Sequence, residues 1–249
     1  MRGVSGACSA VFGLVPAFLA MVLWVHAGAA LAKGTSLSPA ESLNELVEGN
    51  RRFSAGAAVH PRQDTRSRLE TARLGQAPIA LVLACSDSRE AVEALFDQGI
   101  GDLFVVRVAG NTTGAPVLGS VEYAVEHLHI PLIVVLGHTQ CGAVESAWQG
   151  GEVTGNLAAL IASIMPAVQE VKREYADLKD EDALKRRAEI RNVRNSIADI
   201  LANNATAVRL VKENKLRVLG AIYDIESGKV SWLDDVKRTS ATQPPVLPS

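Results

Sequence analysis

Two short clusters of chemically reactive side chains stand out in this 249-residue chain. Residues 85–89, Cys-Ser-Asp-Ser-Arg, directly follow the wholly apolar run 79–84. Residues 138–141, His-Thr-Gln-Cys, follow a second apolar run, 132–136, after a single glycine. Together the clusters offer two thiols, one imidazole and one carboxylate. Thiolate and imidazole ligands select zinc over magnesium or calcium, so this donor set predicts a zinc site.

The candidate zinc ligands are Cys85, His138 and Cys141. Asp87 either takes the fourth position or leaves it to a water molecule, and an open position of this kind is typical of a catalytic zinc. Each side chain also has an ordinary interpretation, since a buried thiol is usually inert and Asp87 could simply cap a helix or pair with Arg89. The occurrence of all these residues after two apolar runs favours the metal site.

The elements that would position these residues alternate along the chain between short apolar runs and amphipathic segments. Strands are expected at residues 79–84, 103–108, 132–136 and 216–223, followed by an extended segment at 230–233. Helices are expected at residues 36–53, 64–74, 90–98, 117–128, 156–171 and 188–212, the last as one long helix or a helix pair. This alternation predicts an α/β fold with a mainly parallel central sheet, flanking helices and an extended N-terminal helix. Ligands bind beyond the carboxyl ends of such strands, so both clusters face one cleft if their two strands lie near each other.

The first 32 residues differ from the rest of the chain. A single positive charge, Arg2, precedes an apolar stretch that ends in the small residues Ala30-Leu-Ala32. This pattern is typical of a secretory signal peptide that is cleaved near Ala32, and an uncleaved membrane anchor is the alternative. We therefore expect an exported, periplasmic protein with one domain at residues 33–238 and a disordered tail at 239–249.

Cleavage near Ala32 would remove Cys8 and leave only Cys85 and Cys141. In an exported protein these two cysteines could form a disulfide instead of binding a metal. Each of them has a metal-binding neighbour in the sequence, which weakens the disulfide interpretation.

The composition narrows the choice of partner. The formal net charge is −2, and the chain contains no run of Lys and Arg of the kind that binds phosphate backbones, so a nucleic-acid partner is not expected. Hydrophobic residues make up 48% and charged residues 21%, which is typical of a globular protein. We therefore expect a small-molecule substrate.

The two clusters also carry a family resemblance. The Cys-Ser-Asp-Ser-Arg run at 85–89, with His-x-x-Cys at 138–141, resembles the β-class carbonic anhydrases. The likeness extends to Phe-Asp-Gln-Gly-Ile-Gly-Asp-Leu-Phe at 96–104, Arg-Val-Ala-Gly-Asn at 107–111 and Ser-Val-Glu-Tyr at 120–123. It covers residues 38–233. It implies reversible hydration of carbon dioxide to bicarbonate and a proton, with one zinc ion per chain and a homodimer or homotetramer.

The resemblance also implies roles for the residues of the two clusters. Cys85, His138 and Cys141 would be permanent zinc ligands. Asp87 and Arg89 would form a gate, in which Asp87 binds zinc in one state and turns to Arg89 in the other while water takes its place. In the second state, hydroxide on the zinc would attack carbon dioxide.

Further roles follow from the same resemblance. Gln76 would orient the substrate as a catalytic residue, and Phe104, Ala109 and Tyr123 would line a small apolar pocket. Val82 stands where relatives with an inhibitory bicarbonate site carry tryptophan. The resemblance therefore implies an open, water-bound state with little regulation by bicarbonate.

Two other functions stay open at this point. The same fold could act on another small linear substrate, such as carbon disulfide, or the protein could bind zinc or carbon dioxide without catalysis. The presence of Asp87, Arg89 and Gln76 argues against the second alternative, since binding alone needs no gate.

Overall fold

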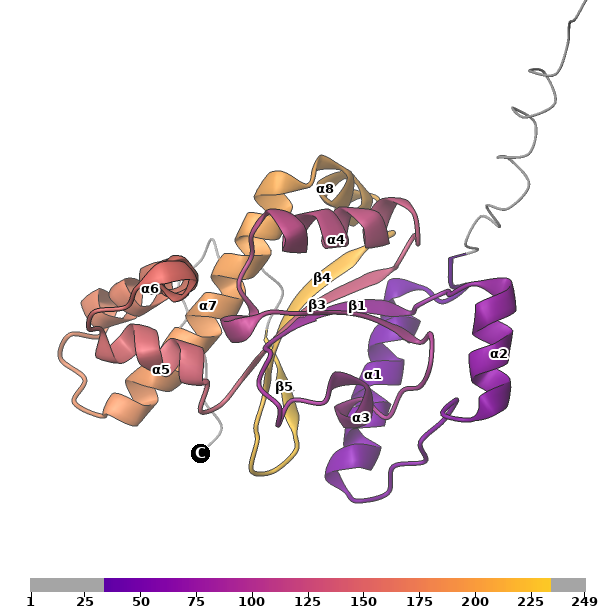
Figure 1. The fold of residues 1–249 in the computed structure, drawn as a ribbon, viewed down its shortest axis with the longest axis horizontal. Coiled ribbons are helices and arrows are strands. Elements are labelled where there is room, and N and C mark those ends of the chain that lie inside the picture. The colour runs from indigo at the N-terminus through magenta and orange to yellow at the C-terminus, as the bar shows by residue number, and fades with distance from the viewer. Residues whose placement is uncertain (1–33, 234–249) are drawn as a thin grey trace, which may run out of the picture. The chain divides into compact units, whose positions relative to one another are not determined.

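The computed structural model describes residues 34–233, and within them the strands form one five-stranded sheet (Figure 1). The strands are β1 (Ala80–Ala84), β2 (Leu103–Arg107), β3 (Leu132–His138), β4 (Arg217–Tyr223) and β5 (Val230–Trp232). Their order across the sheet is β2-β1-β3-β4-β5. The first four strands are parallel and β5 pairs antiparallel with β4, so the predicted mainly parallel α/β sheet is confirmed.

Helices connect the strands and flank the sheet. They are α1 (Pro39–Ser54), α2 (Thr65–Leu74), α3 (Val92–Leu95), α4 (Ala115–Glu126), α5 (Gly142–Gln149), α6 (Gly155–Glu174), α7 (Glu181–Asn203) and α8 (Ala205–Lys212), with a short 3₁₀ turn, η1, at Ala109–Asn111. The N-terminal helix α1 begins as its sequence predicts, because Ser38 and Glu41 form a reciprocal capping box ahead of the first turn.

Two hydrophobic clusters cover the two faces of the sheet (Figure 1). On one face, α4, α7 and α8 pack against alternate strand residues that include Leu81 and Leu83. On the other face, α1 and α3 pack against the intervening residues, among them Ala80 and Val82. All five residues of β1 are buried, which explains why this strand is a continuous apolar run in the sequence.

A third cluster lies beyond the sheet, where α5, α6 and the first half of α7 pack together (Figure 1). Its buried members include Cys85 and Cys141. Helix α7 continues from this cluster onto the sheet, where Val193 and Ile197 belong to the first hydrophobic cluster. The two cysteines are therefore enclosed at the junction between the sheet and a helical layer.

Helix α7 approaches the sheet closely because two strand residues lack side chains. A Cβ atom on Gly137 of β3 would lie 2.7 Å from Val193 Cγ2, and one on Gly220 of β4 would lie 2.8 Å from Val193 Cγ1. Glycine at these positions lets the helix backbone settle against β3 and β4.

Several predicted boundaries differ from the structure. The expected helix at 90–98 is reduced to the single turn of α3, and the strand expected at 132–136 continues to His138. The long helix expected at 188–212 begins earlier, at Glu181, and is divided at Asn204, whose side chain caps α8 by accepting from the Ala207 amide.

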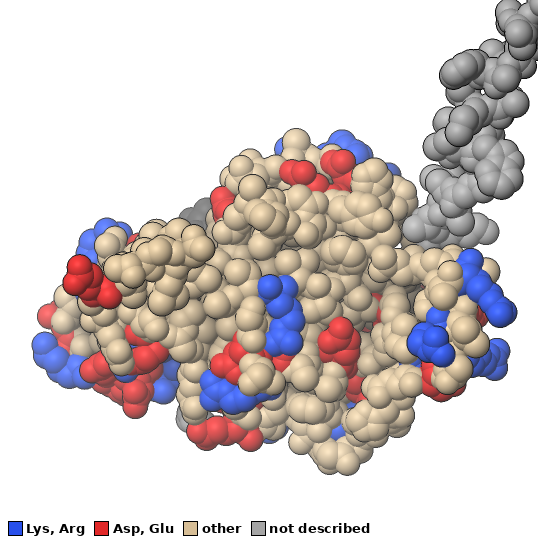
Figure 2. All heavy atoms as spheres, in the orientation of Figure 1, with Lys and Arg blue, Asp and Glu red and all other residues tan. Residues whose placement is uncertain are grey.

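The predicted signal peptide at 1–32 and the predicted tail at 239–249 lie outside the described residues. Within residues 34–233, none of the helices combines the length and apolar character needed to cross a membrane. On the face drawn in Figure 2, acidic and basic side chains are interspersed rather than gathered into one field of a single sign.

Candidate metal centre

The structure brings Cys85, His138 and Cys141 together. Cys85 directly follows β1, His138 is the last residue of β3, and Cys141 is the N-cap of α5. Strands β1 and β3 are hydrogen-bonded neighbours, so their carboxyl ends lie side by side. All three side chains are buried, and their ligand atoms lie within 4.8 Å of one another.

The imidazole of His138 is oriented as a metal ligand requires. Its Nδ1 lies 2.9 Å from the carbonyl oxygen of Thr139, which can only accept, so in the neutral ring Nδ1 carries the proton. Its Nε2 is buried and has no hydrogen-bond partner among residues 34–233. A buried lone pair of this kind, beside two sulfur atoms, fits a zinc ion.

The sulfur of Cys85 lies in an environment that favours the thiolate. The neighbouring Cys141 thiol lowers the pKa of Cys85 despite the opposing effect of burial. The backbone amide of Gly110 donates to Cys85 Sγ, at 3.2 Å. Gly110 has φ of 69°, and a Cβ there would lie 2.6 Å from Ile164 Cδ1, so glycine is needed for this close approach.

The pKa values of Cys141 and His138 are also shifted by their surroundings. The neighbouring Cys85 sulfur and burial raise the pKa of the Cys141 thiol. Burial tends to lower the pKa of His138, but the nearby Cys85 sulfur and Glu90 carboxyl outweigh it and raise the value to about 9. The pocket therefore attracts positive charge, as expected of a cation site.

Asp87 and Arg89 form an ion pair at the open side of this centre. Arg89 Nε lies 2.9 Å from Asp87 Oδ1, and Arg89 Nη2 lies 2.7 Å from Asp87 Oδ2. The hydrogen bond from Arg89 outweighs partial burial and holds the pKa of Asp87 well below its usual range. Asp87 Oδ2 is 4.0 Å from His138 Nε2, so the carboxylate lies beside the candidate ligands while it is bound to Arg89.

Known proteins match the chain over this same region. The sequence pattern of the carbonic anhydrase family matches residues 80–230. Carbonic anhydrase 2 of Mycobacterium tuberculosis is 37% identical over 203 residues, which cover 80% of this chain and 95% of that protein. A carbonic anhydrase of Mycolicibacterium smegmatis is 36% identical over 206 residues, covering 80% of this chain and 97% of the relative.

Solved structures also match this chain. A β-carbonic anhydrase of Sordaria macrospora, described as tetrameric, superposes with a TM-score of 0.63 at 27% identity and covers 78% of this chain and 98% of its own. The chain belongs to the β-carbonic anhydrase family. It is accordingly a zinc lyase of the carbonic anhydrase type.

In this carbonic anhydrase, Arg107 has a positioning role that the sequence did not assign. Its Nε donates to the Cys85 carbonyl at 2.9 Å and its Nη2 donates to the Asp87 carbonyl at 2.6 Å. One side chain at the end of β2 therefore holds the loop that carries both a candidate ligand and the candidate gate. Its membership of the Arg-Val-Ala-Gly-Asn motif was the only available signal.

The other residues assigned by resemblance lie in two places. Ala109 is in η1, next to Gly110 and therefore beside the metal centre. Gln76 is exposed in the loop ahead of β1, at the opposite end of the strand from Cys85. Phe104 is paired in register with Leu81 near the start of β1, and its ring lies 6.1 Å from that of half-exposed Tyr123. Within one chain, Gln76, Phe104 and Tyr123 are not part of the cluster.

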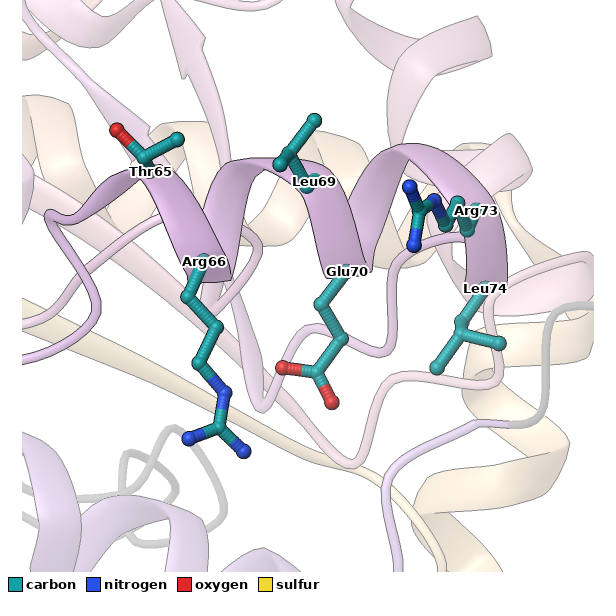
Figure 3. A pocket seen from close by; sticks show the side chains of 6 residues that line it. All are labelled: Thr65, Arg66, Leu69, Glu70, Arg73 and Leu74. Atoms are coloured by element: carbon teal, nitrogen blue, oxygen red, sulfur yellow. The ribbon is translucent and has the colours of Figure 1, made fainter.

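A hollow of about 620 Å³ lies along α2, separate from the metal centre (Figure 3). Figure 3 shows Arg66 and Glu70 projecting from the same side of that helix. The residues that line this hollow are Thr65, Arg66, Leu69, Glu70, Arg73 and Leu74, and none of them belongs to the metal centre.

Proposed function

We propose that this carbonic anhydrase hydrates carbon dioxide reversibly at one zinc ion per chain, held by Cys85, His138 and Cys141. The observation that carries the proposal is the juxtaposition of three buried ligand atoms within 4.8 Å, one of which is the unpartnered Nε2 of the imidazole. When bound there, zinc would supply a Lewis acid that lowers the pKa of a water molecule at its fourth position.

Asp87 and Arg89 act as the gate in this proposal. Arg89 binds both carboxylate oxygens, which keeps Asp87 ionised and engaged with Arg89 rather than with the metal. With the carboxylate so held, Asp87 Oδ2 would accept a hydrogen bond from the attacking water and orient that water toward the substrate. In the closed state Asp87 would leave Arg89 and take the fourth position itself. Val82 in place of a tryptophan supports the open state as the resting one.

The substrate site would be completed by a second subunit. Ala109 supplies part of an apolar wall beside Cys85, whereas Gln76, Phe104 and Tyr123 lie toward the other end of their strands and helix. They can serve a metal centre only if another copy of the chain presents them to it. The tetrameric description of the Sordaria macrospora relative supports assembly into a homodimer or homotetramer.

Export completes the proposal. The N-terminal pattern supports cleavage near Ala32 and a periplasmic enzyme, with membrane anchoring as the alternative. Determining the N-terminus of the protein recovered from cells separates the two, since a mature chain that begins near Lys33 requires cleavage and a retained Met1 excludes it.

The function is tested by stopped-flow measurement of carbon dioxide hydration on purified protein of known zinc content. Activity in proportion to bound zinc supports the proposal. Zinc without hydration would favour the non-catalytic binding protein, and hydrolysis of carbon disulfide in preference to hydration of carbon dioxide would favour the other linear substrate.

A further inference from the structure

Two buried carboxyl groups contact the backbone of the two candidate cysteine ligands. Glu90 is 0% exposed, and its Oε2 accepts a hydrogen bond from the Cys85 amide at 2.8 Å. Glu189 is 6% exposed, and its Oε1 accepts from the Cys141 amide at 3.1 Å. The two acids come from different parts of the chain, one from the turn before α3 and the other from the middle of α7.

These two amides need a side-chain acceptor because of where the cysteines lie. Cys85 is just past the end of β1, and Cys141 precedes the first turn of α5. A buried amide without an acceptor is strongly unfavourable, so something must satisfy each N–H. In both cases a buried acid does so, which fixes the peptide plane from which the cysteine side chain projects.

The amide, the carbonyl and the sulfur of Cys85 each have a hydrogen-bond partner. Glu90 accepts from its amide, Arg107 donates to its carbonyl, and the Gly110 amide donates to its sulfur. Removing Glu90 from this set would free one end of the peptide and let the sulfur move. Cys141 has Glu189 in the corresponding role at its own amide.

Each acid also has one oxygen that satisfies no other group. Glu90 Oε1 and Glu189 Oε2 are buried without a hydrogen-bond partner among residues 34–233. Burial of a carboxyl group in this state is costly, and an amide side chain could accept the same hydrogen bond. What the structure shows each amide to require is therefore an acceptor oxygen with this reach, which a glutamine side chain would also provide.

We propose that Glu90 and Glu189 are positioning residues for the metal, each of which holds one cysteine ligand in place through that cysteine's backbone amide. This inference rests on the proposed zinc ligands. Neither glutamate touches the metal in it. The proposal requires only that the side-chain oxygen is close enough to accept the hydrogen bond from the cysteine amide. Replacing a residue that orients a metal ligand in this way typically changes metal affinity by about 10- to 100-fold.

The test separates reach from charge. Glu90→Gln and Glu189→Gln keep the length of the side chain and the acceptor oxygen but remove the acid. Glu90→Asp and Glu189→Asp keep the acid but shorten the side chain by one methylene, so that the acceptor no longer reaches the amide. Glu93 is exposed on α3, and Glu93→Gln and Glu93→Asp are the matched controls.

Zinc affinity is measured by competition with a chelator, and the sulfur-to-cobalt charge-transfer band of the cobalt-substituted protein reports the geometry at the two thiolates. We expect both aspartate variants to bind zinc about 10- to 100-fold more weakly with a shifted band. The glutamine variants should stay within about threefold of the wild type, as should the Glu93 controls. Circular dichroism confirms that each variant is folded before it is compared.

Two results overturn the inference. Aspartate variants with wild-type affinity and an unshifted band would show that reach to the amide is irrelevant. Glutamine variants as weak as the aspartate variants would show that the acid itself is what matters. Wild-type protein that binds no zinc would instead contradict the ligand assignment, so the two failures are distinguishable.

Discussion

Arg89 contacts Asp87 through three donors, because its Nε and Nη2 bind the two carboxylate oxygens and its backbone amide also donates to Oδ1, at 3.0 Å. The same guanidinium donates to the Gln140 carbonyl at 3.3 Å, in the turn between His138 and Cys141. A single side chain therefore links the loops that carry the two clusters. The carboxylate it holds is both ionised and fixed in direction.

Arg89→Ala should lower kcat/KM for carbon dioxide hydration on the order of a hundredfold, since a correctly placed acid–base group contributes about 10²- to 10⁴-fold. Zinc content should stay unchanged because Arg89 is not a ligand in this account. Arg89→Lys keeps the charge but cannot bind both oxygens, so it should restore only part of the activity. Stopped-flow assay with elemental analysis checks both, and wild-type activity in Arg89→Ala would refute the gate.

Cys141→Ser should lose the metal as well as the activity, because a serine hydroxyl is a poor replacement for a thiolate ligand. Asp87→Ala is the informative comparison, since it removes the proposed hydrogen acceptor and should keep its zinc. Elemental analysis of the two purified variants side by side checks this. Full zinc occupancy in Cys141→Ser would show that this cysteine is not a ligand.

Asn50 joins α1 to the β4–β5 hairpin and should be important for stability. Its Nδ2 donates to the carbonyls of Leu95 and Gly228 at 3.0 and 2.9 Å, and its Oδ1 accepts from the Val230 amide at 2.8 Å. Asn50→Ala leaves buried groups without partners and should lower the free energy of unfolding by about 3 kcal/mol.

Denaturant titration measures the loss at Asn50, with Asn44→Ala as the control. Asn44 is exposed on the same helix, so its replacement should change the free energy of unfolding by less than about 0.5 kcal/mol. Equal effects of the two substitutions would contradict the role given to Asn50.

Asp97 should make stability depend on pH. Its side chain is fully buried and accepts from Arg52 Nε at 2.6 Å and from the His60 amide at 2.8 Å. Burial acts to raise the pKa of Asp97, but these donors outweigh it, and the pKa lies below the value of about 3.9 expected for an unfolded chain. The stabilisation is therefore present above that value and is lost as the pH falls toward the folded pKa.

The variant Asp97→Asn measures this contribution, and asparagine suits the site because residue 97 has φ of 47°. The wild type should be more stable than the variant by about 2 kcal/mol at pH 7, and the difference should shrink as the pH falls from 5 to 3. Unfolding titrations at several pH values check it. A difference that stays constant down to pH 3 would rule out the ionised pair.

The sheet could be predicted from the sequence because its strands are buried on both faces and are therefore continuous apolar runs, as in residues 80–84 of β1. The helix expected at 90–98 could not be predicted correctly. Glu90 turns inward to the Cys85 amide, and Asp97 adopts a positive φ, so only the single turn Val92–Leu95 remains helical. Both features depend on tertiary contacts that local propensity does not contain.

The candidate metal ligands of the site could be predicted from the sequence, but the residues around them could not. The candidate ligands stand out because thiol and imidazole groups follow two strands that prove to be neighbours. Glu90 and Glu189 gave no such signal, since a glutamate on an amphipathic segment is usually exposed. The position of Gln76 was also not predictable, because sequence distance from Cys85 does not show that a whole strand separates them.

Zinc K-edge X-ray absorption on the purified full-length protein tests the central claim most directly. We expect one zinc ion per chain with two sulfur atoms at about 2.3 Å and a lighter shell of nitrogen and oxygen at about 2.0–2.2 Å. Protein without bound zinc, or a zinc shell that contains fewer than two sulfur atoms, would contradict it.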